Sequence, residues 1–279
     1  QQEVGFQILV GGGLGRTPVI GSVIREFLPK QHLLTYLESI LRVYNRLGRR
    51  DNKFKARIKI LVRAMTPKVF AEKVEEDWAA LKDGAVTITD AEFARVQACF
   101  TAPAYQELSD ECDQLASRIS DDSGFKNWTL RNVGEHKQPG YAIVTLALSR
   151  GGVAPGDVSD EQMELVADLA DRYSFGEIRV SHEQNLVLAD VKKSDLHELW
   201  QQLRDADLGA PNLGLLTDMI CCPGGDFCSL ANAKSLPVAE AIQRRFNDLD
   251  YLHDLGDIDL NISGCMNACG HHHVGNIGI

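Results

Sequence analysis

Four of the seven cysteines stand in two pairs whose spacing suits a metal centre. Five residues separate Cys222 from Cys228, three separate Cys265 from Cys269, and thirty-six lie between the pairs. Four thiolates are the ligand set of either a structural zinc ion or a [4Fe–4S] cluster. Paired zinc ligands favour loops of two to four residues, so the five-residue loop favours the cluster.

The segments around these cysteines would hold them in fixed positions. Residues 257–262 alternate polar and apolar side chains, which predicts a strand that ends just before Cys265. Residues 229–235 are compatible with a helix, and Pro237 suits the first turn of another helix. The first pair is therefore expected to precede a helix, where amide dipoles favour thiolate charge.

A run of glycines follows a short apolar strand near the start of the chain. Gly11, Gly12 and Gly13 suggest a dinucleotide-binding loop, but Arg16 occupies the place of the third glycine and Pro18 follows in place of a helix. Two readings remain open: an ordinary turn, or close approach of the backbone to a large planar or anionic cofactor.

A basic strip lies between Arg46 and Arg63, with eight Lys or Arg and one acid. Arg57 and Lys59 alternate with apolar residues, which puts both cations on one side if the segment is extended. The net charge of −10 argues against general nucleic-acid binding, so the strip indicates a small anionic ligand.

Composition points to a globular chain in a reducing compartment. No window approaches the roughly 20 apolar residues of a membrane span. The cysteines are odd in number and lack the dense spacing of a small disulfide-rich secreted domain, which indicates a reducing compartment such as the cytoplasm. Cys99, Cys112 and Cys221 are expected to be buried free thiols. Both ends fall in or near predicted strands, so we expect a segment of a longer protein.

The periodicity of the remaining residues predicts an α+β fold in three parts. Helices are expected over residues 30–47 and from Thr66, then a helical connector to residue 125. A β-α-β-β-α half-domain of the ferredoxin-like type follows. Its predicted elements are a strand over 141–148, a helix with a capping box at Ser159, strands over 177–180 and 185–188, and a helix capped by Ser194.

These motifs together resemble the sirohaem- and [4Fe–4S]-dependent nitrite and sulfite reductases. The resemblance rests on the two cysteine pairs, the glycine run, the stretch Lys55-Ala-Arg57-Ile-Lys59-Ile-Leu-Val62, and the Gln184-Asn185 turn. The sequence from Cys222 to Pro237 is similar to the corresponding segment of bacterial assimilatory sulfite reductase haemoprotein subunits. Ferredoxin–nitrite reductases share the spacing but usually differ in that loop.

The resemblance implies a fold, cofactors and site residues. Residues 1–125 would end a first catalytic domain, 126–206 form the ferredoxin-like half-domain, and 207–279 begin a second catalytic domain. The four paired cysteines would hold the cluster, and Cys269 would also bridge to the sirohaem iron. The remaining implied cofactor contacts are Gly11, Gly12, Gly13, Arg57, Lys59, Gln184 and Asn267, with Arg57 and Lys59 also acting on the substrate.

The implied reaction is the six-electron reduction of sulfite to sulfide, with ferredoxin or a flavoprotein subunit as electron donor. Three alternatives stay open: nitrite reduction to ammonia, a cluster or zinc module without sirohaem, and a nucleotide-dependent oxidoreductase. Family members are about twice this length, so we expect these residues alone to be inactive and to bind neither cofactor stably.

Overall fold

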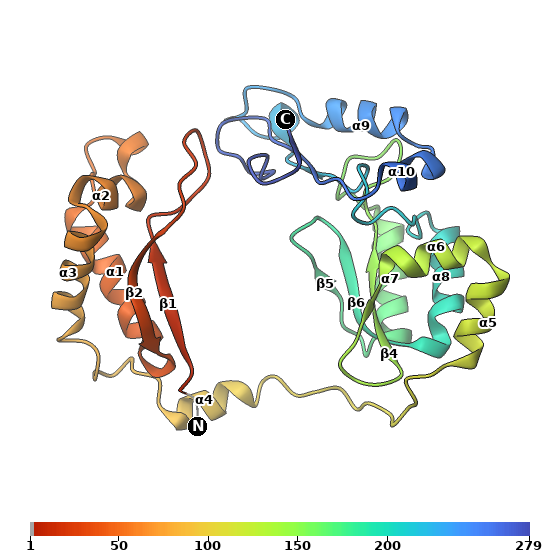
Figure 1. The fold of residues 1–279 in the computed structure, drawn as a ribbon, viewed down its shortest axis with the longest axis horizontal. Coiled ribbons are helices and arrows are strands. Elements are labelled where there is room, and N and C mark those ends of the chain that lie inside the picture. Colours follow the sequence, from red (N-terminus) through yellow and green to blue (C-terminus); the bar gives the residue numbers. More distant parts are fainter. Residues whose placement is uncertain (1–2) are drawn as a thin grey trace. The chain divides into compact units, whose positions relative to one another are not determined.

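The computed structural model describes residues 3–279, which divide after residue 102 into two compact units. Each unit has its own hydrophobic core and is described by itself (Figure 1). Within the described residues, no helix has the length and apolar character needed to cross a membrane.

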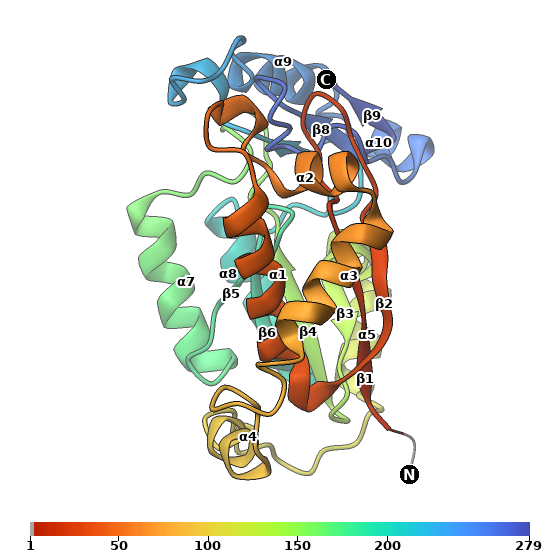
Figure 2. The same cartoon turned by 90° about the vertical axis from the view of Figure 1, so that its left-hand side faces the viewer.

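The first unit is an antiparallel hairpin covered by three helices (Figures 1 and 2). Strands β1 (Gly5–Val10) and β2 (Ser22–Pro29) form the hairpin, and α1 (Leu33–Leu47), α2 (Ile58–Met65) and α3 (Pro67–Trp78) follow. Apolar side chains of the hairpin and helices meet in one core. Its buried members are Ile8, Val10, Leu28, Tyr36, Ile40, Val43, Leu61, Val62, Phe70, Val74 and Trp78.

Two predictions for this unit are confirmed and one is wrong. Helix α1 occupies the expected range, and the Thr66 side chain caps α3 by accepting from the backbone N–H of Val69. The extended conformation of Arg57 to Lys59 is wrong, because Arg57 is the N-cap of α2 and Lys59 lies in its first turn. Burial of Leu61 and Val62 against the hairpin favours the helix over a strand.

A long connector follows, and only part of it is helical. Helix α4 (Asp90–Gln97) has no buried residue, and an irregular stretch precedes α5 (Asp113–Asp121) and α6 (Ser123–Asn132). Cys99 is exposed there, so its expected burial is wrong. Helices α5 and α6 belong to the second unit, where Phe125 and Trp128 are fully buried.

The second unit contains a four-stranded antiparallel sheet in the order β3-β4-β6-β5 (Figure 1). Helices α7 and α8 pack their apolar faces on it and complete the largest core of the chain. The bounds are β3 Val133–Glu135, β4 Tyr141–Leu146, α7 Asp160–Tyr173, β5 Arg179–Val180, β6 Leu186–Lys192 and α8 Leu196–Asp205.

The order β4-α7-β5-β6-α8 confirms the predicted half-domain. Ser159 and Gln162 form the expected capping box at the start of α7. The cap predicted at Ser194 is wrong: a short 3₁₀ turn leads into α8, whose N-cap is Asp195 without a side-chain hydrogen bond.

A small parallel sheet ends the second unit. Strands β7 (Ile220–Cys221), β8 (Leu260–Ile262) and β9 (Ile277–Gly278) run in parallel, and α9 (Leu236–Arg245) and α10 (Leu249–Leu255) connect the first two. The helix predicted over residues 229–235 does not form. The amides of Asn232 and Ala233 donate to the carbonyl of Gly264 in place of a helical partner.

Candidate cofactor site

Parallel pairing of β7 with β8 brings the two cysteine pairs to the same end of the small sheet. Cys221 lies opposite Ile262, and the N–H of Cys222 donates to the carbonyl of Ile262 at 3.0 Å. Because parallel strands end at the same edge, Cys222 leaves β7 beside the point where Cys265 follows β8. The N–H of Gly264 donates to Sγ of Cys222 at 3.0 Å.

The loop that holds Cys228 packs on the turn that precedes Cys265. The carbonyl of Gly264 accepts from the N–H groups of Asn232 and Ala233 at 2.9 and 3.0 Å. A Cβ atom at Gly264 would lie 2.7 Å from Cα of Gly224 and 2.8 Å from the carbonyl oxygen of Ala233. Only glycine fits this close approach of two backbones.

The sulfur atoms themselves do not form a ligand cluster in this arrangement. Cys222, Cys228 and Cys265 are half-buried and Cys269 is exposed. Across residues 3–279, no three His, Cys, Asp or Glu side chains are arranged to hold a metal ion. The fold therefore brings the backbone of both loops together, while the four thiols remain in separate orientations.

Cys221 has a different environment from its neighbour Cys222. Its side chain is buried in the small core beside Leu215 and Met219. Burial, and then the adjacent Cys222, raise the pKa of the Cys221 thiol to about 12. Such a thiol stays protonated at neutral pH and behaves as a core residue.

Gln184 connects the half-domain to the strand that carries the first cysteine. Its Oε1 accepts from the N–H of Cys221 at 2.7 Å, and its Nε2 donates to the carbonyl of Cys221 at 3.1 Å. The residue lies at the tip of the β5–β6 hairpin with φ of 62°. The carboxamide oxygen therefore pairs with the peptide group before Cys221, and the carboxamide nitrogen pairs with the peptide group after it.

Asn185, which we did not single out for a contact, is fully buried and links three segments. Its Oδ1 accepts from the N–H of Leu148 at 2.9 Å, and its Nδ2 donates to Asp218 at 3.0 Å. Burial raises the pKa of Asp218. Asn185 and Asp218 are 33 positions apart, so no local sequence pattern could predict that they pair.

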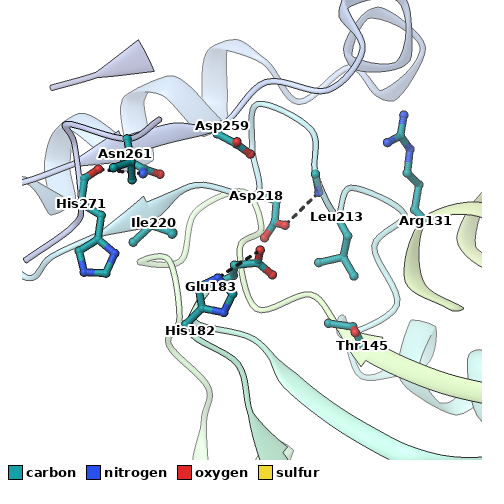
Figure 3. A pocket seen from close by; sticks show the side chains of 12 residues that line it. Arg131, Thr145, His182, Glu183, Leu213, Asp218, Ile220, Asp259, Asn261 and His271 are labelled. Atoms are coloured by element: carbon teal, nitrogen blue, oxygen red, sulfur yellow. Dashed lines mark hydrogen bonds and ion pairs between the residues drawn. The ribbon is translucent and has the colours of Figure 1, made fainter. Parts of the chain in front are cut away.

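A pocket of about 460 Å³ lies in this part of the second unit (Figure 3). Its lining comes from the β5–β6 hairpin, the segment before β7, strand β8 and the turn after it (Figure 3). Three carboxylates line it: Glu183, Asp218 and Asp259. Arg131, His182 and His271 line it as well, and none of the predicted site residues does.

The glycine run forms the loop of the β1–β2 hairpin in the first unit, and no helix follows it. Gly13 and Val19 exchange backbone hydrogen bonds at 2.9 and 3.0 Å. Gly11 and Gly13 have φ of 84° and 145°, which favour glycine. The loop therefore closes the β1–β2 hairpin, and its close approach to a cofactor stays a prediction.

Lys59 and Arg57 meet this loop in different ways. Lys59 is buried, and its Nζ donates to the carbonyls of Leu14 and Thr17 at 3.1 and 3.0 Å. Burial, and then Arg57 and Arg63, lower the pKa of Lys59. Arg57 is exposed and lines a hollow of about 250 Å³ together with Gly12 and Lys59.

The last predicted contact, Asn267, lies in the turn between the second pair of cysteines and is exposed. Ala268 beside it is buried with φ of 57°, so the turn directs Asn267 and Cys269 outward. The predicted residues of the first unit and those of the second form two separate groups within their own units.

Comparison with protein families matches two parts of the chain. Residues 1–82 match the family described as nitrite and sulphite reductase 4Fe-4S domain. Residues 135–206 match the nitrite/sulfite reductase ferredoxin-like half domain. The first match contains no cysteine, and all four predicted cluster ligands lie outside both matches.

Characterised relatives align over almost the whole chain. A chloroplastic ferredoxin–nitrite reductase of Zea mays is 26% identical, covering 99% of this chain and 43% of the relative. "Sulfite reductase [ferredoxin] 2" of Mycolicibacterium paratuberculosis is 25% identical, with 99% and 43% covered. The chain thus spans about two fifths of the length of these relatives.

A solved structure shows the same fold. The Mycobacterium tuberculosis NirA protein superimposes with a TM-score of 0.65 at 23% identity, covering 96% of this chain and 43% of that protein. The fold and the two matches define an α+β protein built around a ferredoxin-like half-domain, which confirms the predicted fold class. Two separate parts of the chain thus match domains of nitrite and sulfite reductases, and relatives named for both enzymes align along it.

Proposed function

We propose that this chain carries the cluster ligands of a sirohaem- and [4Fe–4S]-dependent reductase that converts sulfite to sulfide. The observation that supports this most is the contact between the two cysteine loops, where the N–H of Gly264 donates to Sγ of Cys222. Two loops thirty-six residues apart approach closely enough to exclude a Cβ atom at Gly264. The four thiols carried by these two loops match the donor set of a [4Fe–4S] cluster.

In this proposal the four paired cysteines hold the cluster, and Cys269 also reaches the sirohaem iron. The N–H···S bond from Gly264 stabilises thiolate charge on Cys222, because hydrogen bonds to cluster sulfurs favour the more negative state. The exposure of Cys269 suits a ligand shared with a second cofactor. When bound, the two cofactors supply electrons singly to the substrate.

The two cations near the glycine loop take separate roles in this proposal. Arg57 is exposed, so its planar guanidinium can meet carboxylates of sirohaem or the anionic substrate through paired N–H donors. Lys59 already donates to two loop carbonyls, so it fixes the shape of the loop while adding positive charge nearby. Gly11, Gly12 and Gly13 present backbone to the cofactor, and Gln184 and Asn267 border it.

A second candidate is the reduction of nitrite to ammonia, because relatives named for nitrite and for sulfite match almost equally well. The names of both relatives include ferredoxin, which supports ferredoxin as the electron donor over a flavoprotein subunit. A reducing compartment such as the cytoplasm keeps the thiols free for the cluster. The remaining rival is a cluster or zinc module without sirohaem.

The test is metal and cofactor analysis of the complete gene product, purified without oxygen from cells that make sirohaem. We expect iron, acid-labile sulfide and a sirohaem absorption band, without stoichiometric zinc. Single Ser substitutions at Cys222, Cys228, Cys265 and Cys269 should each abolish the cluster, whereas Cys99→Ser at an exposed site should retain it. Bound zinc, or a full cluster in any of the four variants, would overturn the ligand assignment.

Turnover with each anion then separates the two substrates. The wild-type gene product is supplied with reduced ferredoxin and either sulfite or nitrite, and sulfide or ammonia is measured. Faster turnover of sulfite at limiting concentration supports the proposal. Preference for nitrite supports the second candidate, and turnover of neither anion by the fully loaded protein contradicts both.

A further inference from the structure

The strand that leads to the first cysteine has one paired edge and one edge turned toward the half-domain. On the paired side, the N–H of Cys222 donates to the carbonyl of Ile262 in β8. Successive residues of a strand direct their backbone groups to opposite sides. The N–H and carbonyl of Cys221 therefore point away from β8, which is the neighbour of β7 in the sheet order β7-β8-β9.

Gln184 occupies this second edge as if it were one residue of another strand. Its carboxamide accepts from the N–H of Cys221 at 2.7 Å and donates to the carbonyl of Cys221 at 3.1 Å. A primary amide has the same donor and acceptor as a peptide group, so it can pair with both. Strand β7 has only two residues, and this pairing therefore holds half of its length.

The backbone at Gln184 is unusual for a residue that only makes a turn. Its φ of 62° lies in the left-handed region, where glycine and asparagine are preferred and a long side chain is uncommon. A Cβ atom at Gly156 would lie 3.0 Å from Cβ of Gln184, so the neighbouring chain leaves room for the Gln stem. These features favour a role for the carboxamide over a role in turn formation.

We propose that Gln184 is a positioning residue for the first cysteine loop, acting through the peptide groups of Cys221. The inference rests on the proposed function, because it assigns what Gln184 does for the cluster. With both edges of β7 paired, Cys222 leaves the strand in one direction and meets the N–H of Gly264. Without the carboxamide, only β8 restrains the strand before Cys222.

Hydrogen exchange at the N–H of Cys221 tests the contact without requiring any cofactor. Gln184→Gly suits the left-handed backbone and removes the carboxamide, and Gln184→Leu keeps the stem without a hydrogen bond. In the complete gene product we expect exchange in the peptide containing Cys221 to become about ten- to hundredfold faster in both variants. Glu183→Ala is the matched control, because this exposed residue is in the same turn.

The pattern across the variants decides the cause. Unchanged exchange in both Gln184 variants would overturn the inference. Faster exchange in Gln184→Gly alone would also overturn it, because backbone freedom at glycine would then be sufficient. Equal acceleration by Glu183→Ala would assign the effect to the whole hairpin tip instead of to the carboxamide.

The consequence for the cluster has a spectroscopic readout. In the iron-loaded protein, we expect both Gln184 variants to shift the cluster's electron paramagnetic resonance signal and reduction potential and to lose iron faster in air. Identical spectra, potential and iron loss in all forms would overturn the positioning role. If the Gln184 variants accelerate exchange at Cys221 but the wild-type protein never binds iron, the proposed function is refuted and the contact itself stays established.

Discussion

The contact between the two cysteine loops can be broken by one methyl group at Gly264. In Gly264→Ala, the new Cβ would lie 2.7 Å from Cα of Gly224 and 2.8 Å from the carbonyl oxygen of Ala233. Ordinary carbon contacts begin near 3.5 Å, so the loops must separate by roughly 0.8 Å. Overpacking of this kind costs about 1–3 kcal/mol.

The displacement matters more for the cluster than for stability. Metal sites tolerate errors of only about 0.2 Å in ligand distances, so a separation several times larger should prevent the four thiols from closing on one cluster. We therefore expect Gly264→Ala to fold with a modest loss of stability but to retain little iron or acid-labile sulfide. Exchange at the amides of Asn232 and Ala233, which donate to Gly264, should accelerate together with the loss of iron.

Gly151→Ala is the matched control for this substitution. A Cβ atom there meets nothing within 4 Å, and its backbone does not require glycine. The control should keep wild-type iron content and amide protection. Wild-type iron content in Gly264→Ala, with the amides of Asn232 and Ala233 still protected, would refute the view that this close approach sets the ligand positions.

Three further substitutions test other parts of the fold. Lys59→Met removes the ammonium that holds the glycine loop. Because the freed carbonyls can regain hydrogen bonds with water, we expect the free energy of unfolding to fall by about 1–2 kcal/mol, with loop amide exchange roughly 5–30 times faster. The exposed Lys55→Met should leave that exchange unchanged, and an equal effect of both substitutions would contradict the contact. Burial, and then Asp190, raise the pKa of Tyr105 to about 12. Between about pH 10 and 12 the folded state therefore keeps a proton that the unfolded chain has lost, so stability falls as pH rises. Burial also raises the pKa of Tyr36 and Tyr173, so Tyr105→Phe should reduce this dependence in urea titrations without abolishing it. An unchanged alkaline profile would argue against it. Ser159→Ala removes the side-chain half of the capping box and should lower stability by about 1 kcal/mol, whereas an unaltered melting temperature would show that α7 does not depend on the cap.

Local sequence signals predicted the long, periodic elements well. Helix α1 and the half-domain helices repeat apolar residues at helical spacing, and Ser159 with Gln162 marks a helix start within four residues. Such signals depend on residues that are close together in the chain, so they can be recognised without knowledge of the fold. Ser194 shows their limit, because a 3₁₀ turn precedes α8 and its N-cap is Asp195, so the helix starts at Leu196.

The parts that failed depend on partners far away in the sequence. Residues 229–235 are compatible with a helix by composition, but Asn232 and Ala233 donate to Gly264 in the other loop. Lys59 was expected beside Arg57 on one face, but its ammonium is held by loop carbonyls more than forty positions away. The periodicity of apolar residues does not predict hydrogen bonds between residues that are far apart in the sequence.

The sequence named candidate site residues, which stay predictions, but it did not give the geometry around them. The spacing of the cysteines named four candidate ligands, while β7 and β8, which bring their loops together, have only two and three residues. The alternation over residues 257–262 indicated the strand β8, but it contains no information about parallel pairing with the two-residue β7. The engagement of Gln184 with Cys221 was equally hidden, because the two residues are 37 positions apart.

The crossover between β7 and β8 has a consequence for the order of assembly. The two cysteine loops become neighbours only after α9 and α10 have folded and returned the chain to lie alongside β7. Joining ends this distant is slow compared with forming a helix, because the entropy of closing the intervening segment opposes it. We therefore expect this crossover to close before both cysteine pairs can hold the proposed cluster together.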